Sequence, residues 1–398
     1  MIISTDRRSV LAWSGGTLLL IASGGMLRAA AVGGLPPDGD AYSPWQYWNA
    51  PSLKGTPLAL VAAGVLAANP HDTQPWLFRI SDAAIDIFAD LSRNLGAMDC
   101  YVREMHLGLG CAIENMLLVA APNGYAATLD AEPGSLTALA ARDGMVNAAT
   151  LRLERQSPNP PDALARAIPD RHTNRYPYDR KRAVPQQWRD FAAHADAGDD
   201  VRVFLFEDGA ERDEFDKAVV DATLSIVADT TMIADSDRWL RMSRSEIEQH
   251  RDGPTLEAAG LSAVTYMFAK VFPVSPETAH QAWVDQTRAQ LATARLTGVI
   301  AVRDRYDRAG TIAAGRAWQR LHLGAIAHGV AMQPVNQPIE MIDRERATGR
   351  GDAWRRRMAQ FTGGDWQATF SFRAGMPTTD APASPRRALK DVVTQQRS

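Results

Sequence analysis

The chain has 398 residues, of which 45% are hydrophobic and 22% charged, and its formal net charge is −3. This composition is typical of a globular protein long enough for two units with their own cores. Because acidic residues balance the arginines, no strong basic field exists, and this argues against a nucleic-acid-binding role.

The N-terminus carries the paired arginines Arg7 and Arg8 ahead of an apolar run, and small residues at 29–31 follow that run. This arrangement resembles a twin-arginine (Tat) export signal. It predicts that residues 1–31 are removed and that the protein is exported to the periplasm with no stable membrane insertion. An uncleaved anchor or a chance arginine pair is the alternative. Residues 32–55, rich in Gly, Pro and aromatics, predict an N-terminal arm.

The first unit is predicted to span residues 56–161. Thr56 reads as a helix N-cap with Pro57 at the first helical position, and Asn69-Pro70 ends that helix. The expected elements are a helix at Leu58–Ala68, a hairpin of Trp76–Ile80 with Ile85–Phe88, a helix at 102–121, and strands at Tyr125–Leu129 and Thr150–Leu153.

Two cysteines, Cys100 and Cys111, fall in the predicted helical segment at Asp99–Ala121. Eleven residues of helix separate two side chains by about 16 Å. A disulfide needs Cα atoms within about 7 Å, so these two cannot pair inside one helix. The eight histidines are scattered and no CxxC pattern occurs, which argues against a structural zinc site.

The second unit is predicted to span residues 162–385, after a Pro-rich linker, and residues 386–398 form a tail. Its expected elements are strands at Val201–Phe206, Gly298–Arg303 and Thr369–Arg373, helices at Glu211–Ala228 and Thr311–His328, and a helix-rich stretch at 236–295. Strands interleave with dominant helices along the whole chain, so the predicted class is α+β.

Two predicted helical segments echo one another. Gly110–Tyr125 aligns with Gly315–Val330 through five identities, and both helices end near a glycine. We interpret the echo as an internal duplication that makes one chain pack as a dimer does. The alternative is that two apolar helices ending in Gly simply look alike.

Two polar clusters carry the functional prediction. Asn69–Trp76 places an imidazole, a carboxylate, a carboxamide and a large ring on a short helix-to-strand connection, where ligand sites are common. In an extended Arg171–Arg175, the side chains of Arg171, Thr173 and Arg175 project to one side and could clamp a phosphate. An ordinary connector and a solvated basic loop are the alternatives.

Together the clusters resemble the two signatures of the FMN-binding nitroreductase family, an N-terminal RxSxR and a helix–APSSxNxQPW–strand turn. The first appears here as Arg171-x-Thr173-x-Arg175, and the second as His71-Asp72-Thr73-Gln74-Pro75-Trp76. The doubled chain, the export signal and the His-x-Thr-Gln-Pro-Trp form are similar to the Acg-type branch. The resemblance implies a nitroreductase-like fold and a single-chain pseudo-dimer, monomeric as a molecule.

The resemblance further implies one FMN per chain at the interface of the halves, because Ala50–Lys54 stands where unit one would need RxSxR. It implies a further phosphate contact from Arg386 and Arg387, with a charged tail as the alternative. It also implies that backbone near Pro334 and Asn336 passes the flavin N5, with a simple loop as the alternative. The implied cofactor-binding residues are thus His71, Asp72, Gln74, Pro75, Trp76, Arg171, Thr173, Arg175, Pro334, Asn336, Arg386 and Arg387.

One residue departs from the family pattern, because Asp72 stands where the family has Asn. A carboxylate near the ring disfavours negative charge on the reduced flavin unless an arginine pairs with it. Residues 244–290 are interpreted as a lid over the flavin, or otherwise as a helical packing insert.

The expected function is flavin-mediated hydride transfer from a reductant to a small-molecule acceptor, with no side chain acting as nucleophile. The alternative functions are a redox-silent protein that sequesters FMN and a protein that binds no flavin.

Overall fold

The computed structural model describes residues 39–138, 143–194, 200–261 and 275–394, and the predicted export signal lies outside them. Helices and antiparallel strands share this part of the chain, and the predicted α+β class is confirmed. The strands form two separate sheets.

The first sheet has the strand order β3-β4-β2-β1-β9. Its antiparallel strands are β1 (Trp76–Ile80), β2 (Ala84–Asp90), β3 (Tyr125–Ala131) and β4 (Met145–Arg155), and β9 (Val393–Thr394) pairs with β1 in parallel. The strand β9 comes from the far end of the chain, so the C-terminal segment crosses onto the sheet of the first unit.

The second sheet has the order β5-β6-β8-β7 and is antiparallel throughout. Its strands are β5 (Val201–Phe206), β6 (Leu296–Val302), β7 (Ala331–Pro334) and β8 (Gln367–Gly375). Read from the β7 edge, this order repeats the β3-β4-β2-β1 order of the first sheet. Each sheet also has a register shift at its central pair, between Ile87 and Phe88 in one and between Ile300 and Ala301 in the other.

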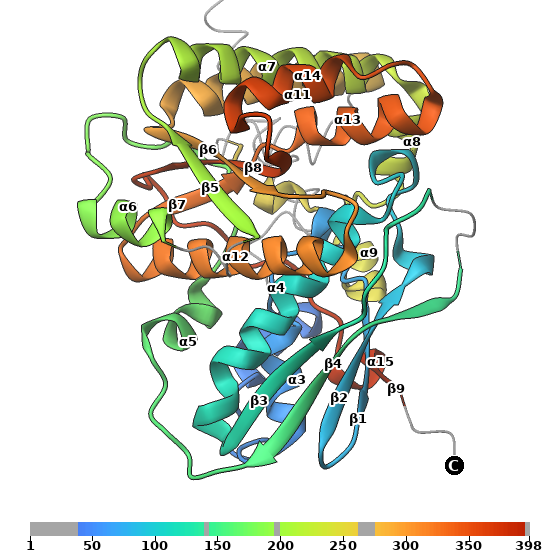
Figure 1. The fold of residues 1–398 in the computed structure, drawn as a ribbon, viewed down its shortest axis with the longest axis vertical. Helices are drawn as coiled ribbons and strands as arrows, with labels where there is room; N and C mark the ends of the chain where they lie inside the picture. The colour runs from blue at the N-terminus through green and yellow to red at the C-terminus, as the bar shows by residue number, and fades with distance from the viewer. Residues whose placement is uncertain (1–38, 139–142, 195–199, 262–274, 395–398) are drawn as a thin grey trace, which may run out of the picture.

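Two long helices, α4 (Arg103–Ala120) and α12 (Arg308–Ala327), lie between the sheets (Figure 1). In the same view α7, α11, α13 and α14 lie on the far side of the second sheet. The remaining bounds are α2 (Pro44–Tyr47), α3 (Pro57–Gly64), α5 (Ala163–Ala167), α6 (Gln186–Ala193), α7 (Ala210–Ala228), α8 (Thr230–Asp237), α9 (Arg244–His250), α11 (Pro276–Thr293), α13 (Gln337–Thr348), α14 (Ala353–Thr362) and α15 (Leu389–Val392).

The helices α4 and α12 cross at a pair of glycines. A Cβ atom on Gly315 would lie 2.0 Å from the carbonyl oxygen of Leu107, and one on Gly110 would lie 2.2 Å from that of Ile312. Leu107 and Ile312 stand three residues before the two glycines, so the contact is reciprocal, as across a two-fold axis. One continuous core around this crossing joins residues of both sheets.

The strands β1, β2, β5, β6 and β8 and the helices α4, α7 and α12 confirm the predicted elements to within a few residues. The helix predicted to reach Ala68 ends at Gly64. Beyond this point side chains, and not helix N–H groups, donate hydrogen bonds to the backbone carbonyls. Arg171 donates to the Leu66 carbonyl and Asn69 donates to that of Ala67. The sequence patterns missed the short elements β7, β9, α2, α5, α6 and α15 and the longer helices α13 and α14.

Cys100 and Cys111 are free thiols, as the helix spacing predicted. Among the described residues, no group of three or more His, Cys, Asp or Glu gathers to hold a metal ion. One segment, Arg103–Asn123, is apolar and long enough to cross a membrane, but 78% of it is buried inside the protein, as in a core helix.

Replacing Gly315 by Ala is expected to destabilise the protein by about 1–3 kcal/mol or more, because the added methyl group overlaps backbone that cannot move aside. Gly364→Ala is the matched control, since a methyl group added there would meet no neighbouring atom within 4 Å. Urea denaturation followed by circular dichroism measures both. Equal midpoints for the two variants would contradict the tight crossing.

Candidate functional site

The connection from α3 to β1 is a strained turn. A short 3-10 segment, Pro70–Asp72, forms its first part, and His71, Asp72 and Gln74 have φ angles of 46°, 49° and 49°. Residues other than glycine rarely adopt this left-handed conformation, and three within four positions is a costly arrangement. Such strain persists where surrounding contacts hold it, and it is common at functional sites.

The side chain of Asn69 holds this turn in place. Its Oδ1 accepts a hydrogen bond from the Gln74 backbone N–H at 2.8 Å, and its Nδ2 donates to Asp72 Oδ1 at 3.2 Å. The sequence pattern had indicated Asn69 only as a helix terminator. An Asn-Pro followed by several polar residues was the available signal for this second role.

The predicted clamp of unit two lies against the turn. Arg171 is buried and donates from Nη2 to the Leu66 carbonyl at 3.0 Å, just before the turn. Arg175 donates from Nη1 to the Ala258 carbonyl at 3.1 Å. Thr173, which lies between these two arginines in the sequence, is half-buried.

Arg386 arrives from the C-terminal segment and completes the group. Its Nη1 donates to Asp72 Oδ1 at 2.6 Å, and its Nη2 donates to the Ala67 carbonyl at 3.3 Å. We call Arg171, Arg175 and Arg386 the basic cluster. Residues separated by up to 314 positions in sequence therefore meet around Asp72.

The basic cluster carries more positive charge than its surroundings neutralise. Three guanidinium groups face one carboxylate, that of Asp72, and burial lowers the pKa of all three arginines, that of Arg171 to about 9 with Arg386 as the second cause. Burial raises the Asp72 pKa to about 7 although Arg386 opposes it. A buried excess of positive charge favours binding of an anion.

Several polar atoms of this region have no partner. Among the described residues, no acceptor bonds Arg171 Nε or Arg386 Nε, and no donor bonds Asp72 Oδ2. His322 of α12 is fully buried beside this region, and burial followed by the charge of Arg171 lowers its pKa well below the usual value. Buried polar atoms are normally satisfied, so these atoms fit a site built for a polar ligand.

The other predicted residues of the turn and tail bind one another. Gln74 Oε1 accepts from the Arg387 backbone N–H at 2.7 Å, and Arg387 Nη1 donates to the Gln74 carbonyl at 3.1 Å. Arg387 thus holds the buried turn in place. Trp76, beside the buried Pro75, is fully buried and belongs to the main core.

Pro334 and Asn336 lie where β7 ends and α13 begins. Asn336 contacts a second buried group, since its Nδ2 donates to Glu104 Oε1 and its Oδ1 accepts from the Ser371 backbone N–H. The alternative of a simple loop does not hold for the whole segment, because β7 includes Pro334 and α13 starts at Gln337. The predicted approach of this backbone to a flavin stays a prediction.

Residues 251–260, which we call the strap, cover the turn. The Gly253 backbone N–H donates to the Asp72 carbonyl at 3.1 Å, and Gln74 Nε2 donates to the Arg251 carbonyl at 2.8 Å. The Ala258 carbonyl at the other end of the strap accepts from Arg175. The strap thus bridges both halves of the site. Residues 276–290, also within the predicted lid, belong to α11 and pack against α7.

Sequence patterns gave no reason to single out Arg93 and Asp252. Arg93 donates to the Thr73 carbonyl and pairs with Asp252, and Asp252 also pairs with Arg241 at 2.6 Å. These pairs fasten the strap to the turn. Since the partners are far apart in sequence, only the folded chain brings them together.

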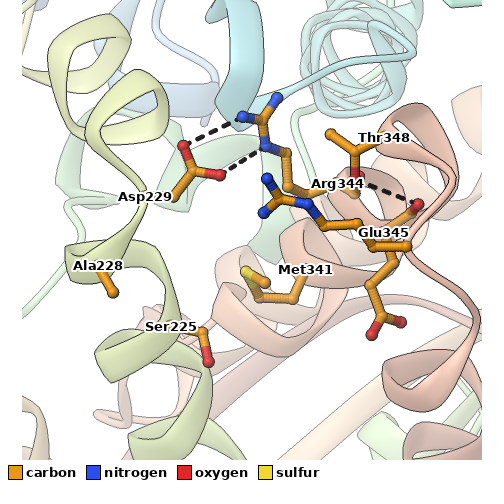
Figure 2. Close-up of a pocket in the computed structure, with 8 residues that line it drawn as sticks. Ser225, Ala228, Asp229, Met341, Arg344, Glu345 and Thr348 are labelled. Atoms are coloured by element: carbon orange, nitrogen blue, oxygen red, sulfur yellow. Dashed lines mark hydrogen bonds and ion pairs between the residues drawn. The ribbon is translucent and has the colours of Figure 1, made fainter.

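A cavity of about 290 Å³ lies elsewhere, between α7 and α13 (Figure 2). Its Arg344 donates to both carboxylate oxygens of Asp229, at 2.8 and 3.1 Å, and Thr348 donates to the Arg344 carbonyl. These groups already form hydrogen bonds with one another, so the cavity is a poorer candidate site for a charged ligand than the basic cluster.

No family model matches the chain. Two proteins of Mycobacterium tuberculosis strains, named "Putative NAD(P)H nitroreductase" MT3217 and Rv3131, are each 26% identical to it over 340 residues, which cover 84% of this chain and 90% of the relative.

Solved structures also resemble the chain. The FMN-dependent nitroreductase NfnB from Mycobacterium smegmatis, in complex with NADPH, has 16% identity and a TM-score of 0.36, covering 59% of this chain and 98% of that one. A nitroreductase with bound FMN from Desulfitobacterium hafniense has 11% identity and a TM-score of 0.33, covering 58% and 97%. Because both TM-scores are low, only the sequence relatives bear on the family.

Arg386→Ala is expected to destabilise the protein by about 3–5 kcal/mol at about pH 8.5, since it leaves the Asp72 carboxylate buried without its cation. The loss should be smaller at about pH 5.5, because the raised Asp72 pKa keeps that carboxyl neutral there. Urea denaturation at both pH values measures this difference. In a protein that already carries Asp72→Asn, Arg386→Ala should cause the same loss of stability at both pH values. If Arg386→Ala causes equal losses at both pH values with Asp72 present, the pairing is contradicted.

Proposed function

We propose that this chain is a distant member of the nitroreductase superfamily and an FMN-dependent oxidoreductase that transfers hydride equivalents to a small-molecule acceptor, and its similarity to the two putative nitroreductases supports this. The observation that carries the proposal is the basic cluster, where Arg171, Arg175 and Arg386 converge from two distant segments. A phosphate group supplies the missing anion.

The residues present fit the phosphate of FMN. Each unpartnered guanidinium N–H, Arg171 Nε and Arg386 Nε, can donate a charge-assisted hydrogen bond to a phosphate oxygen. Arg175 can exchange the neutral Ala258 carbonyl for a charged acceptor. Thr173 can add a hydroxyl donor from the same segment.

Bound FMN would supply a ring that accepts and donates hydride, and the protein supplies binding, orientation and electrostatic tuning. In this proposal His71 and Gln74 lie at one side of the ring and the backbone near Pro334 and Asn336 lies at the other. Asp72, which pairs with Arg386, lies toward the phosphate. The neutral His71, whose pKa burial lowers to about 4, adds no charge at that side. The strap excludes water from the turn.

We further propose that the chain is a pseudo-dimer with one such site. The repeated strand order, the matching register shifts and the reciprocal glycine crossing all support an internal duplication. Residues 39–56, which lead into α3 and include Ala50–Lys54, contain no arginine, so the second site lacks its phosphate clamp.

A redox-silent protein that sequesters FMN is the second candidate, and the strap favours it. By bonding Asp72 and Arg175 at once, the strap closes the turn against other molecules. Anaerobic addition of NADPH or dithionite distinguishes the two functions, since rapid bleaching of the flavin absorption would exclude the silent form.

Export of an Acg-type protein through the Tat route remains part of the proposal, on the strength of Arg7 and Arg8. Arg7→Lys with Arg8→Lys should leave the protein in the cytoplasmic fraction. Unchanged periplasmic recovery would refute the assignment.

Arg171→Ala combined with Arg175→Ala should weaken FMN binding by more than about 100-fold, because each charge-assisted bond is worth roughly 1.5–3 kcal/mol. Flavin content after purification and a fluorescence titration measure the loss. Arg152→Ala removes an exposed arginine of β4 and serves as the control. A folded double variant that retains flavin would refute the clamp.

Asp72→Asn should tighten FMN binding by about tenfold, or roughly 1.4 kcal/mol, because the phosphate no longer competes with a carboxylate for Arg386. In the unmodified protein, affinity should rise as pH falls through about 7, where Asp72 gains its proton. The variant should lack this rise. Weaker binding by the variant would show that Asp72 assists the ligand.

A further inference from the structure

A second buried charged group lies where α4, α13 and β8 meet. It contains four carboxyl groups and two guanidinium groups, all of them at most 6% exposed as residues. We call its carboxyl members the acid cluster; they are Asp99, Glu104, Glu340 and Asp343, and the arginines are Arg103 and Arg305.

Both arginines form ion pairs with Asp343. Arg103 Nε donates to its Oδ2 at 2.8 Å, and Arg305 Nη2 donates to its Oδ1 at 2.9 Å. Tyr306 adds a hydroxyl donor at 2.8 Å. These contacts favour the carboxylate form, and the pKa of Asp343 is lowered although burial opposes this.

Asp99 relies on backbone donors. Its Oδ1 and Oδ2 accept from the N–H groups of Glu104 and Met105, at 3.1 and 2.9 Å. The closest ion pairs of Arg103 and Arg305 are with Asp343, at 2.8 and 2.9 Å, so the two remaining carboxyls are only weakly neutralised. Burying an unpaired carboxylate is far costlier than burying the neutral acid.

Those two carboxyls belong to Glu104 and Glu340. Glu104 Oε1 accepts from Asn336 Nδ2 and also accepts a long hydrogen bond of 3.4 Å from Arg103 Nη2, with which it forms an ion pair. Glu340 Oε2 has no hydrogen-bond partner within the described part of the chain. Burial raises the pKa of Glu104 to about 8, and burial followed by the charge of Glu104 raises that of Glu340 well above its usual range.

Glu104 lies between the two elements assigned to the ring. Gly108, one turn or about 6 Å further along α4, packs on the strained turn, since a Cβ there would lie 3.0 Å from Pro70 Cδ. Asn336, which Glu104 contacts directly, begins the segment assigned to the other side of the ring.

We propose that Glu104 and Glu340 form a buried proton store that supplies the proton accompanying hydride transfer at the neighbouring site. Bound FMN would supply a hydride, and a quinone acceptor that takes this hydride and one proton from the store would become a hydroquinone. The Glu104 O–H bond breaks, the carboxylate keeps its contacts with Asn336 and Arg103, and water later returns the proton. This use of the store rests on the proposed function.

The store itself can be tested without any cofactor. Full-length protein as purified is unfolded with urea from about pH 5 to about pH 8. The folded state binds protons there that the unfolded state has released, so its stability falls as pH rises. The slope of stability against pH gives the number of protons that the folded state binds in excess of the unfolded state. Glu104→Gln and Glu340→Gln should each lower this excess by about one proton. Exposed Glu154→Gln is the control and should leave it unchanged. Slopes for both variants equal to that of the unmodified protein would overturn the proposal.

The use of the store is tested in the FMN-loaded protein by stopped-flow oxidation with a quinone. The rate in the unmodified protein should fall above about pH 8, and Glu104→Gln should be about 100-fold slower with no such fall. Bound flavin and a normal KM in this variant separate proton supply from damage to the site. An unchanged pH profile would overturn proton supply. Failure to bind FMN would instead sink the proposed function and leave the cofactor-free measurement decisive.

Discussion

The close crossing of α4 and α12 is the contact on which the rest of the architecture depends. Gly110 and Gly315 allow the two backbones to approach so closely that any side chain at either position would overlap the opposite carbonyl. Through Gly108, α4 supports the strained turn, while α12 lies beside the segment that carries Arg171. The separation of the two helices therefore fixes how far the turn stands from the basic cluster.

The site has opposite charge balances at its two ends. Around Asp72, the guanidinium groups of the buried Arg171 and Arg386 and the half-buried Arg175 outnumber one carboxylate, and around Asn336 four buried carboxyls outnumber two guanidinium groups. An elongated ligand with a phosphate at one end and a redox-active ring at the other suits this asymmetry. At either end, the free-energy cost of burial would be much larger if all the charged groups were ionised and unpaired.

Parts of the fold and of the candidate site could be predicted from residues that are close together in the sequence. The helix ending at Asn69-Pro70, the hairpin after Trp76 and the spacing of Arg171, Thr173 and Arg175 each depend on neighbouring residues. The Asp72–Arg386 pair joins residues 314 positions apart, and the acid cluster draws from segments near 100 and near 340. No periodicity links such residues, and the two-residue strand β9 is too short to leave a pattern. Arg387 could be flagged as basic, but only the folded chain shows that it holds Gln74.

The crossing of the C-terminal segment onto the first sheet sets a time order for assembly. Arg386, Arg387 and β9 follow both halves in the sequence, so they are synthesised after α4 and α12. Both halves can collapse earlier around α4 and α12, but the turn has no arginine on Asp72 until Arg386 has been made. A nascent chain that stops short of Arg386 therefore holds an open, uncapped site.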